Sequence, residues 1–213
     1  SPKTRVYYTV VAMDDTYRPD ILLAPDGKPE VPGAEILPSP VCCTIDSNGT
    51  LYNTDETANK IVTHSRSGET LDYWGESGDG PGQLNAPSGL AFDNDGNLWV
   101  VSTRSPRIQK FTPNGEFISG FGEFGTEPGR LNYPWGIAVD PVNNSLLVAD
   151  WRNDRIQRFS QDGEFMQVIG EPGDGKGQLN HPSDVAVDAH GDVYVCDRGN
   201  HRVLQFNPRG LFI

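Results

Sequence analysis

Long hydrophobic runs are missing from this chain of 213 residues, whose apolar stretches are only as long as single β-strands. A membrane-spanning helix needs about 20 consecutive apolar residues, so the sequence predicts no membrane insertion. Basic side chains are also scarce, with 17 Lys and Arg against 29 Asp and Glu. The resulting net charge of −12 disfavours nucleic acid and anionic lipid as partners.

Cysteine is rare as well, and the three cysteines have the spacing neither of a zinc site nor of a disulfide-rich scaffold. Cys42 and Cys43 are adjacent and Cys196 is distant. Zinc sites use Cys-x-x-Cys pairs, and disulfide scaffolds use many cysteines in even number. We therefore expect buried thiols, with a bridge from Cys196 to one of the adjacent pair as the alternative.

Turn-forming residues, by contrast, are abundant, and they punctuate a repeat. The 24 Gly and 17 Pro predict an all-β domain without long helices. Four segments share one register, and their leading leucines are 47, 47 and 48 residues apart. The shared positions are Leu37, Leu84, Leu131 and Leu179; Pro40, Pro87, Pro134 and Pro182; Asp46, Asp93, Asp140 and Asp188; Lys60, Arg107, Arg155 and Arg202; and Gly68, Gly115, Gly163 and Gly210.

Each repeat contains three or four short β-rich runs separated by turn residues, which is typical of a propeller blade. In the second repeat the expected strands cover residues 89–92, 98–101, 108–111 and 117–121. We refer to the four strands of a blade as a to d, in chain order.

Several motifs resemble NHL repeats. They are Gly-Asn-His-Arg-Val at 199–203, Arg-Asn-Asp-Arg-Ile at 152–156, and strands of the form Pro-x-Gly-[Ile/Leu]-Ala-[Val/Phe]-Asp. The first repeat is degenerate, because His64 stands where the others carry phenylalanine. The resemblance covers residue 37 to the C-terminus and implies a β-propeller of four-stranded blades, commonly six.

The expected organisation is one propeller domain of which this chain holds about four and a half blades, with a closed ring of four or five blades as the alternative. Its expected parts are a strand segment or partial blade at 1–36, blades at 37–83, 84–130 and 131–178, and a blade lacking its last strand at 179–213. An unpaired strand c beside residues 203–206 would favour self-assembly, because it could accept a strand from another molecule.

The turns between strands a and b contain alternating oxygen-bearing side chains, as a calcium loop does. Asp93-Asn-Asp-Gly-Asn is the fullest example. It lacks the downstream Glu of an EF-hand, and a similar turn recurs in every repeat, so we predict structural turns. The sequence therefore predicts no metal site and no cofactor, with calcium as the alternative.

Basic residues at the start of strand c have acidic counterparts at the end of strand b. Arg155 follows Asp150, and Arg202 follows Asp197. We expect ion pairs within these blades. At the same position at the end of strand b, the first repeat has the acidic residue Asp55, whereas the second repeat has Ser102.

Loop residues that differ between repeats are the candidates for binding, because blade geometry does not dictate them. In a propeller, the d–a and b–c loops meet on one face, which we call the top face. It would combine aromatic rings and guanidinium groups, as binding hot spots do. The candidate binding residues are Arg104, Tyr133, Trp135, Trp151, Arg152, His181, Arg198, Asn200 and His201.

The resemblance implies several classes of function, since NHL propellers include protein-binding modules, RNA-binding modules and peptidyl-hydroxyglycine amidating lyases. A lyase of this kind would need several histidines that converge on a zinc ion. A serine-nucleophile hydrolase is disfavoured separately, because the chain has no Gly-x-Ser-x-Gly motif. We favour a non-catalytic module that binds a protein, peptide or glycan, with a metal-dependent enzyme of lyase or lactonase type as the alternative. No catalytic residue is assigned. The four histidines are His64, His181, His190 and His201.

Two Asn-x-Ser/Thr triplets give an indication of the cellular compartment in which the protein is found. Asn48 and Asn143 would accept glycans in a secretory pathway. They favour an extracellular or periplasmic location with glycosylation at both sites, and a cytoplasmic location is the alternative. In an extracellular setting we expect the module to be part of a larger assembly.

Overall fold

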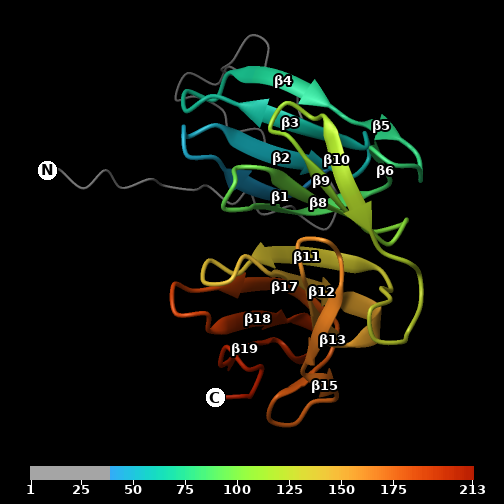
Figure 1. Cartoon of the computed structure of the whole chain (residues 1–213), viewed down its shortest axis with the longest axis vertical. Coiled ribbons are helices and arrows are strands. Elements are labelled where there is room, and N and C mark those ends of the chain that lie inside the picture. Colours follow the sequence, from blue (N-terminus) through green and yellow to red (C-terminus); the bar gives the residue numbers. More distant parts are fainter. Residues whose placement is uncertain (1–38) are drawn as a thin grey trace, which may run out of the picture. The chain divides into compact units, whose positions relative to one another are not determined.

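The computed structural model describes residues 39–213, and the strand segment expected at 1–36 lies outside this part. Four antiparallel sheets follow one another along the chain, each built from strands in sequence order (Figure 1). The first two sheets contain β1 (Pro40–Ile45), β2 (Leu51–Asp55), β3 (Lys60–His64) and β4 (Thr70–Trp74), then β7 (Pro87–Phe92), β8 (Leu98–Ser102), β9 (Arg107–Phe111) and β10 (Phe117–Phe121). The last two contain β11 (Pro134–Val139), β12 (Leu146–Asp150), β13 (Arg155–Phe159) and β14 (Phe165–Ile169), then β17 (Pro182–Val187), β18 (Val193–Asp197) and β19 (Arg202–Phe206).

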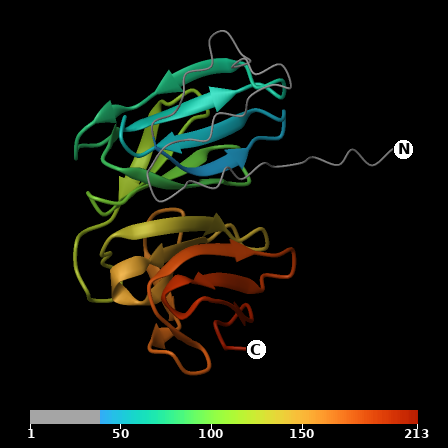
Figure 2. The same cartoon turned by 180° about the vertical axis from the view of Figure 1, so that it is seen from behind.

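These sheets are the blades of a propeller arrangement, and the strands of each sheet run side by side from both directions of view (Figures 1 and 2). We number them first to fourth blade. The only helical segments in residues 39–213 are the short 3-10 turns η1 (Trp151–Asn153) and η2 (Arg198–Asn200). The prediction of an all-β propeller is therefore confirmed.

Glycine-rich connectors lead from one blade into the next. Two of them are bracketed by short parallel strand pairs. These pairs are β5 (Glu76–Ser77) with β6 (Gln83–Leu84), and β15 (Glu171–Pro172) with β16 (Gln178–Leu179).

The repeated aspartate after strand a closes the a–b turn. Asp93 Oδ1 accepts the backbone N–H groups of Asp95 and Asn97 at 3.0 and 2.9 Å. Asp188 Oδ1 makes the same pair of contacts with His190 and Asp192. Such side-chain to backbone bonds stabilise tight turns, so each aspartate has a local structural use.

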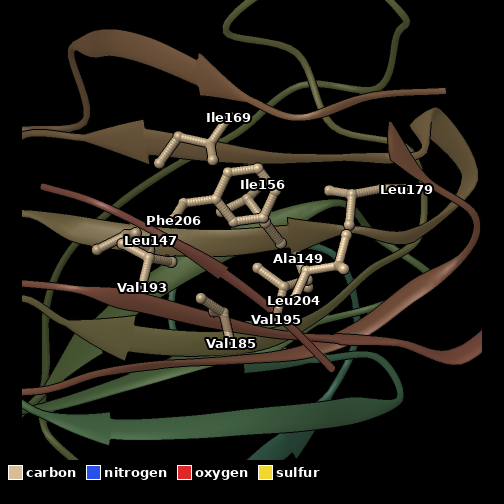
Figure 3. Packing of buried hydrophobic residues seen from close by; sticks show 10 residues of the cluster. All are labelled: Leu147, Ala149, Ile156, Ile169, Leu179, Val185, Val193, Val195, Leu204 and Phe206. Carbon is tan, nitrogen blue, oxygen red and sulfur yellow. The ribbon is translucent and has the colours of Figure 1, made fainter. Parts of the chain in front are cut away.

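The hydrophobic core lies in layers between neighbouring blades. The layer between the third and fourth blades joins the buried faces of both sheets, and its side chains point toward one another (Figure 3). Two further clusters fill the first–second and second–third boundaries. The largest layer contains Leu147, Ala149, Ile156, Ile169, Leu179, Val185, Val193, Val195, Leu204 and Phe206.

The inner strands pack closely, β1 on β7, β7 on β11 and β11 on β17. Glycine in the Pro-x-Gly motif makes this approach possible. A Cβ atom on Gly89 would lie 2.5 Å from the carbonyl oxygen of Trp135, and one on Gly136 would lie 2.6 Å from the Cα of Asp184. The motif therefore serves the packing of neighbouring blades.

The expectation of buried thiols is wrong. Cys43 and Cys196 are exposed, Cys42 is half-buried, and all three are free. Cys196 lies on β18, and no further blade covers that face of the fourth sheet within the described residues. After β19, Phe212 forms an isolated β-bridge with Phe206. Separately, no helix in residues 39–213 is both long enough and apolar enough to cross a membrane.

Candidate binding site at the top face

Left-handed residues and 3-10 turns shape the top-face loops. Tyr133 and His181 precede the first residue of β11 and β17 and have φ values of 52° and 51°. This conformation is costly for a residue with a side chain, so it needs local support. At His181 the support is a hydrogen bond from its backbone N–H to Asp154 Oδ1 at 2.7 Å, which ties the fourth blade to the third.

Six of the nine predicted binding residues form one connected group. Trp151 lies at its centre, with ring centroids 5.4 Å from Trp135 and 4.8 Å from His181. The Cζ atom of Arg152 lies 4.0 Å from the ring centre of Tyr133 and 5.5 Å from that of Trp151. We call this group the top-face cluster; its members are Tyr133, Trp135, Trp151, Arg152, His181 and Arg198.

Arg198 completes the cluster from the fourth blade. Its Cζ atom lies 5.3 Å from the ring centre of Trp135. Arg152 and Arg198 are both exposed. Guanidinium groups over aromatic rings are held by cation–π attraction while their N–H groups stay available in the plane.

The other three predicted residues stand outside the cluster. Arg104 faces Glu56 at 3.6 Å in an exposed ion pair. Asn200 donates from Nδ2 to the carbonyl of Gly173 and to Asp197, each at 2.9 Å. These contacts give Asn200 a structural use, while its binding role stays a prediction, as does that of exposed His201.

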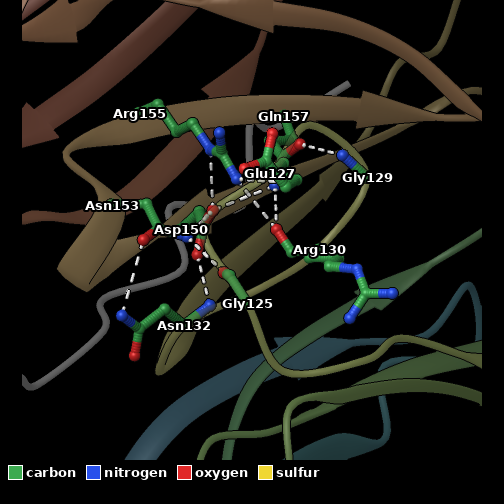
Figure 4. Close-up of polar contacts among 9 residues, drawn as sticks. All are labelled: Gly125, Glu127, Gly129, Arg130, Asn132, Asp150, Asn153, Arg155 and Gln157. Carbon is green, nitrogen blue, oxygen red and sulfur yellow. Dashed lines mark hydrogen bonds and ion pairs between the residues drawn. The ribbon is translucent and has the colours of Figure 1, made fainter.

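A buried carboxylate supports the loop beneath the cluster (Figure 4). Asp150 Oδ2 accepts hydrogen bonds from Asn153, Arg155 and Gln157 at 2.8–2.9 Å, and Oδ1 accepts the N–H of Asn132 at 2.7 Å. The guanidinium of Arg155 also donates to two carbonyls of the connector that leads into the third blade. This network fixes the b–c loop, the connector and strand c to one another.

The fourth blade repeats the network, and the first two blades depart from it. Asp197 pairs with Arg202 at 2.8 Å, so the predicted ion pairs are confirmed in both later blades. In the second blade, Ser102 leaves Arg107 without a carboxylate partner among residues 39–213. In the first blade the expected pair is absent, because Asp55 instead accepts the N–H groups of Thr57 and Ala58.

A cavity of about 310 Å³ opens beside the cluster and was missed from the sequence. It lies among the inner strands, and the third residue of each strand a contributes to its wall. Aligning the repeats would have shown this position, where two blades carry glycine and two do not. The lining residues are Val41, Cys42, Ser88, Gly89, Trp135, Gly136, Ser183, Asp184 and Arg198.

Two ionisable groups line this cavity besides Arg198. Burial raises the pKa of the Cys42 thiol to about 11, so the thiol is uncharged at neutral pH. Desolvation also raises the pKa of Asp184, and a hydrogen bond from the N–H of Val185 at 2.9 Å opposes that shift. Asp184 and Arg198 share the cavity without forming an ion pair.

The histidines are distributed over separate parts of the blades. His64 lies on β3 and contacts Asn53 at 3.1 Å, and His190 lies in the β17–β18 turn. Only His181 and His201 lie in top-face loops. Within residues 39–213, no three His, Cys, Asp or Glu side chains are grouped as metal ligands.

Solved structures share this fold. A catalytically inactive virginiamycin B lyase from Staphylococcus aureus, solved with quinupristin, superposes with a TM-score of 0.63 at 21% identity over 90% of this chain. A streptogramin B lyase gives 0.63 at 18% identity over 90% of the chain, and a chain of the nidogen/laminin complex gives 0.65 at 24% identity over 83%. The chain spans 60%, 59% and 64% of the length of these three structures. At these identities the likeness is one of fold.

Sequence comparison adds the family. The search of curated proteins gave no match. The model of the NHL repeat matches residues 131–159 and 179–206, which hold strands a to c of the third and fourth blades. These matches identify NHL repeats in the third and fourth blades, and together with the propeller arrangement of the four sheets they support membership of the NHL-repeat β-propeller family.

Proposed function

We propose that this chain is a non-catalytic interaction module that binds a protein, peptide or glycan through the top-face cluster, as part of an extracellular assembly. The observation that carries the proposal is the cluster itself, in which three aromatic rings, an imidazole and two exposed guanidinium groups from two blades contact one another. Tryptophan, tyrosine and arginine dominate binding hot spots because they combine a large contact area with directed hydrogen-bond donors.

Rigidity of the support adds to the case. The loops that carry Trp151 and Arg198 are held by the buried carboxylates of Asp150 and Asp197. A preorganised surface loses less conformational entropy when a partner binds. The nidogen/laminin complex shows a chain of the same fold in a protein complex, which is consistent with a protein as the partner.

The test compares binding to an array of extracellular proteins, peptides and glycans. Trp135→Ser removes the ring that contacts both Trp151 and Arg198, and we expect it to weaken binding of the module's ligand about 30-fold or more. Val142→Ser is the matched control, because Val142 is 63% exposed in the β11–β12 turn, away from the cluster. Circular dichroism and thermal denaturation verify that both variants fold.

Binding that Trp135→Ser removes and Val142→Ser preserves would support the proposal. The proposal would be contradicted if no member of the array binds the chain, or if the binding of its ligands is unchanged by Trp135→Ser. A metal-dependent lyase or lactonase-type enzyme is the other candidate, and it predicts that turnover of a substrate depends on an added divalent cation.

A further inference from the structure

The two arginines of the top-face cluster lack the carboxylate partners that other arginines of this chain have. Arg155, Arg158 and Arg202 each contact an aspartate at 2.6–2.8 Å. Within residues 39–213, neither Arg152 nor Arg198 has an acidic group within 4.0 Å. We propose that the cluster recognises an acidic peptide segment, whose carboxylates bind Arg152 and Arg198; this inference rests on the function proposed above.

Stacking prepares both guanidinium groups for carboxylates. Arg152 lies over Tyr133 and Arg198 over Trp135, at 4.0 and 5.3 Å from the ring centres. The rings attract the guanidinium groups through cation–π contacts, and each planar guanidinium carries its N–H donors along its edge. A carboxylate can accept two parallel hydrogen bonds from such an edge. Because the rings already position both arginine side chains, little conformational entropy is lost when the ligand binds.

The cavity determines what accompanies the acidic groups. Arg198 and Trp135 stand at its wall, next to Val41 and the uncharged Cys42. Asp184 lines the same space, and its carboxylate repels another. The ligand's carboxylates therefore stay outside with the arginines, and an uncharged side chain enters the cavity.

This combination favours a peptide over a sulfated glycan. Both ligands would supply anions to Arg152 and Arg198. A peptide also supplies an apolar side chain for the cavity and for the rings of Trp135 and Trp151, whereas a sulfated sugar carries charge on neighbouring positions. The expected recognition element is two acidic residues with an apolar residue between or beside them.

The probes are fluorescent peptides with two glutamates separated by one to three residues, with leucine among them, measured by fluorescence polarisation. We expect Arg152→Gln and Arg198→Gln each to weaken binding about tenfold or more, because each removes a charge-assisted hydrogen-bonded pair. Arg209→Gln is the matched control, since Arg209 is exposed in the turn after β19, at the opposite end of its blade from the b–c loops, and we expect no change. Replacing the glutamates by glutamine should abolish binding, and replacing leucine by aspartate should weaken it.

The same binding experiment is repeated with a heparin-derived oligosaccharide as the alternative ligand. The inference is overturned if no acidic peptide binds at millimolar concentration, if binding ignores both arginine variants, or if only the sulfated sugar binds in an arginine-dependent way. If array ligands still depend on Trp135 while acidic peptides fail, the proposed binding function stands and the choice of an acidic segment falls.

Discussion

Single residues at the end of strand b determine how firmly each blade holds its loops. Asp150 is fully buried and receives four hydrogen bonds, one of them from buried Arg155. A buried ion pair contributes little relative to apolar residues, yet removal of one partner leaves the other charge uncompensated. At the same position of the second blade, the Ser102 hydroxyl accepts only one long hydrogen bond, from the N–H of Asn85 at 3.5 Å.

We expect the exchange of Asp and Ser at this position to change the free energy of unfolding in opposite directions in the two blades. We expect Asp150→Ser to lower the free energy of unfolding by about 3 kcal/mol, because Arg155 loses its carboxylate. Ser102→Asp should raise it by about 1 kcal/mol, because Arg107 and the N–H of Asn85 gain a charged acceptor. Urea denaturation measures both.

Glu123→Gln is the control for loss of an acidic group. Its pair with Arg130 is exposed, and we expect a change below about 1 kcal/mol. A destabilised Ser102→Asp variant would contradict the view that the second blade lacks a useful carboxylate.

Elements pack at the distance that their smallest residues allow. Along the inner strands, Gly89 of β7 faces the backbone of Trp135 on β11, and Gly136 of β11 faces Asp184 on β17. These glycines set the spacing of neighbouring blades and the width of the cavity, since the same residues line its wall.

A methyl group at this contact is expected to force two inner strands apart. Gly89→Ala should lower the free energy of unfolding by roughly 1–3 kcal/mol, the usual cost of overpacking. In Gly175→Ala the nearest atom is the end of the flexible Gln178 side chain, at 2.8 Å, so we expect a change below about 0.5 kcal/mol. Thermal denaturation of both variants is the measurement, and equal stability of the two would contradict the proposed close contact.

At the scale of the whole molecule, antiparallel blades separate two sets of loops. The b–c and d–a loops carry the top-face cluster, whereas the a–b turns carry both predicted glycan acceptors. Asn48 and Asn143 are exposed in the turns after β1 and β11. Glycans on these asparagines would leave the cluster accessible.

Expression in a eukaryotic secretory host tests this separation. We expect glycans at both asparagines, seen as a mass decrease after enzymatic deglycosylation, and equal affinity for the acidic peptide probes before and after that treatment. Asn48→Gln and Asn143→Gln identify the sites. Binding that appears only after deglycosylation would show that the turns and the cluster are not separate.

The sequence by itself determined the repeat, the strand positions and the ion pairs within the third and fourth blades. The strands expected at 98–101 and 117–121 are β8 and β10, and the pair of Asp150 with Arg155 is formed as predicted. These features depend on residues a few positions apart, in strands joined by tight turns. Their geometry therefore follows from register alone.

Only the tertiary structure decided which loop residues meet. Trp151 reaches Trp135 on its own blade and His181 on the next, while Asn200 turns to the connector that precedes its blade. The lack of an acidic partner for Arg198 among residues 39–213, the cavity with Asp184 and the exposure of the cysteines likewise depend on contacts between blades. Register within one repeat carries no information on distances across a blade boundary, because side-chain size on both sides sets them.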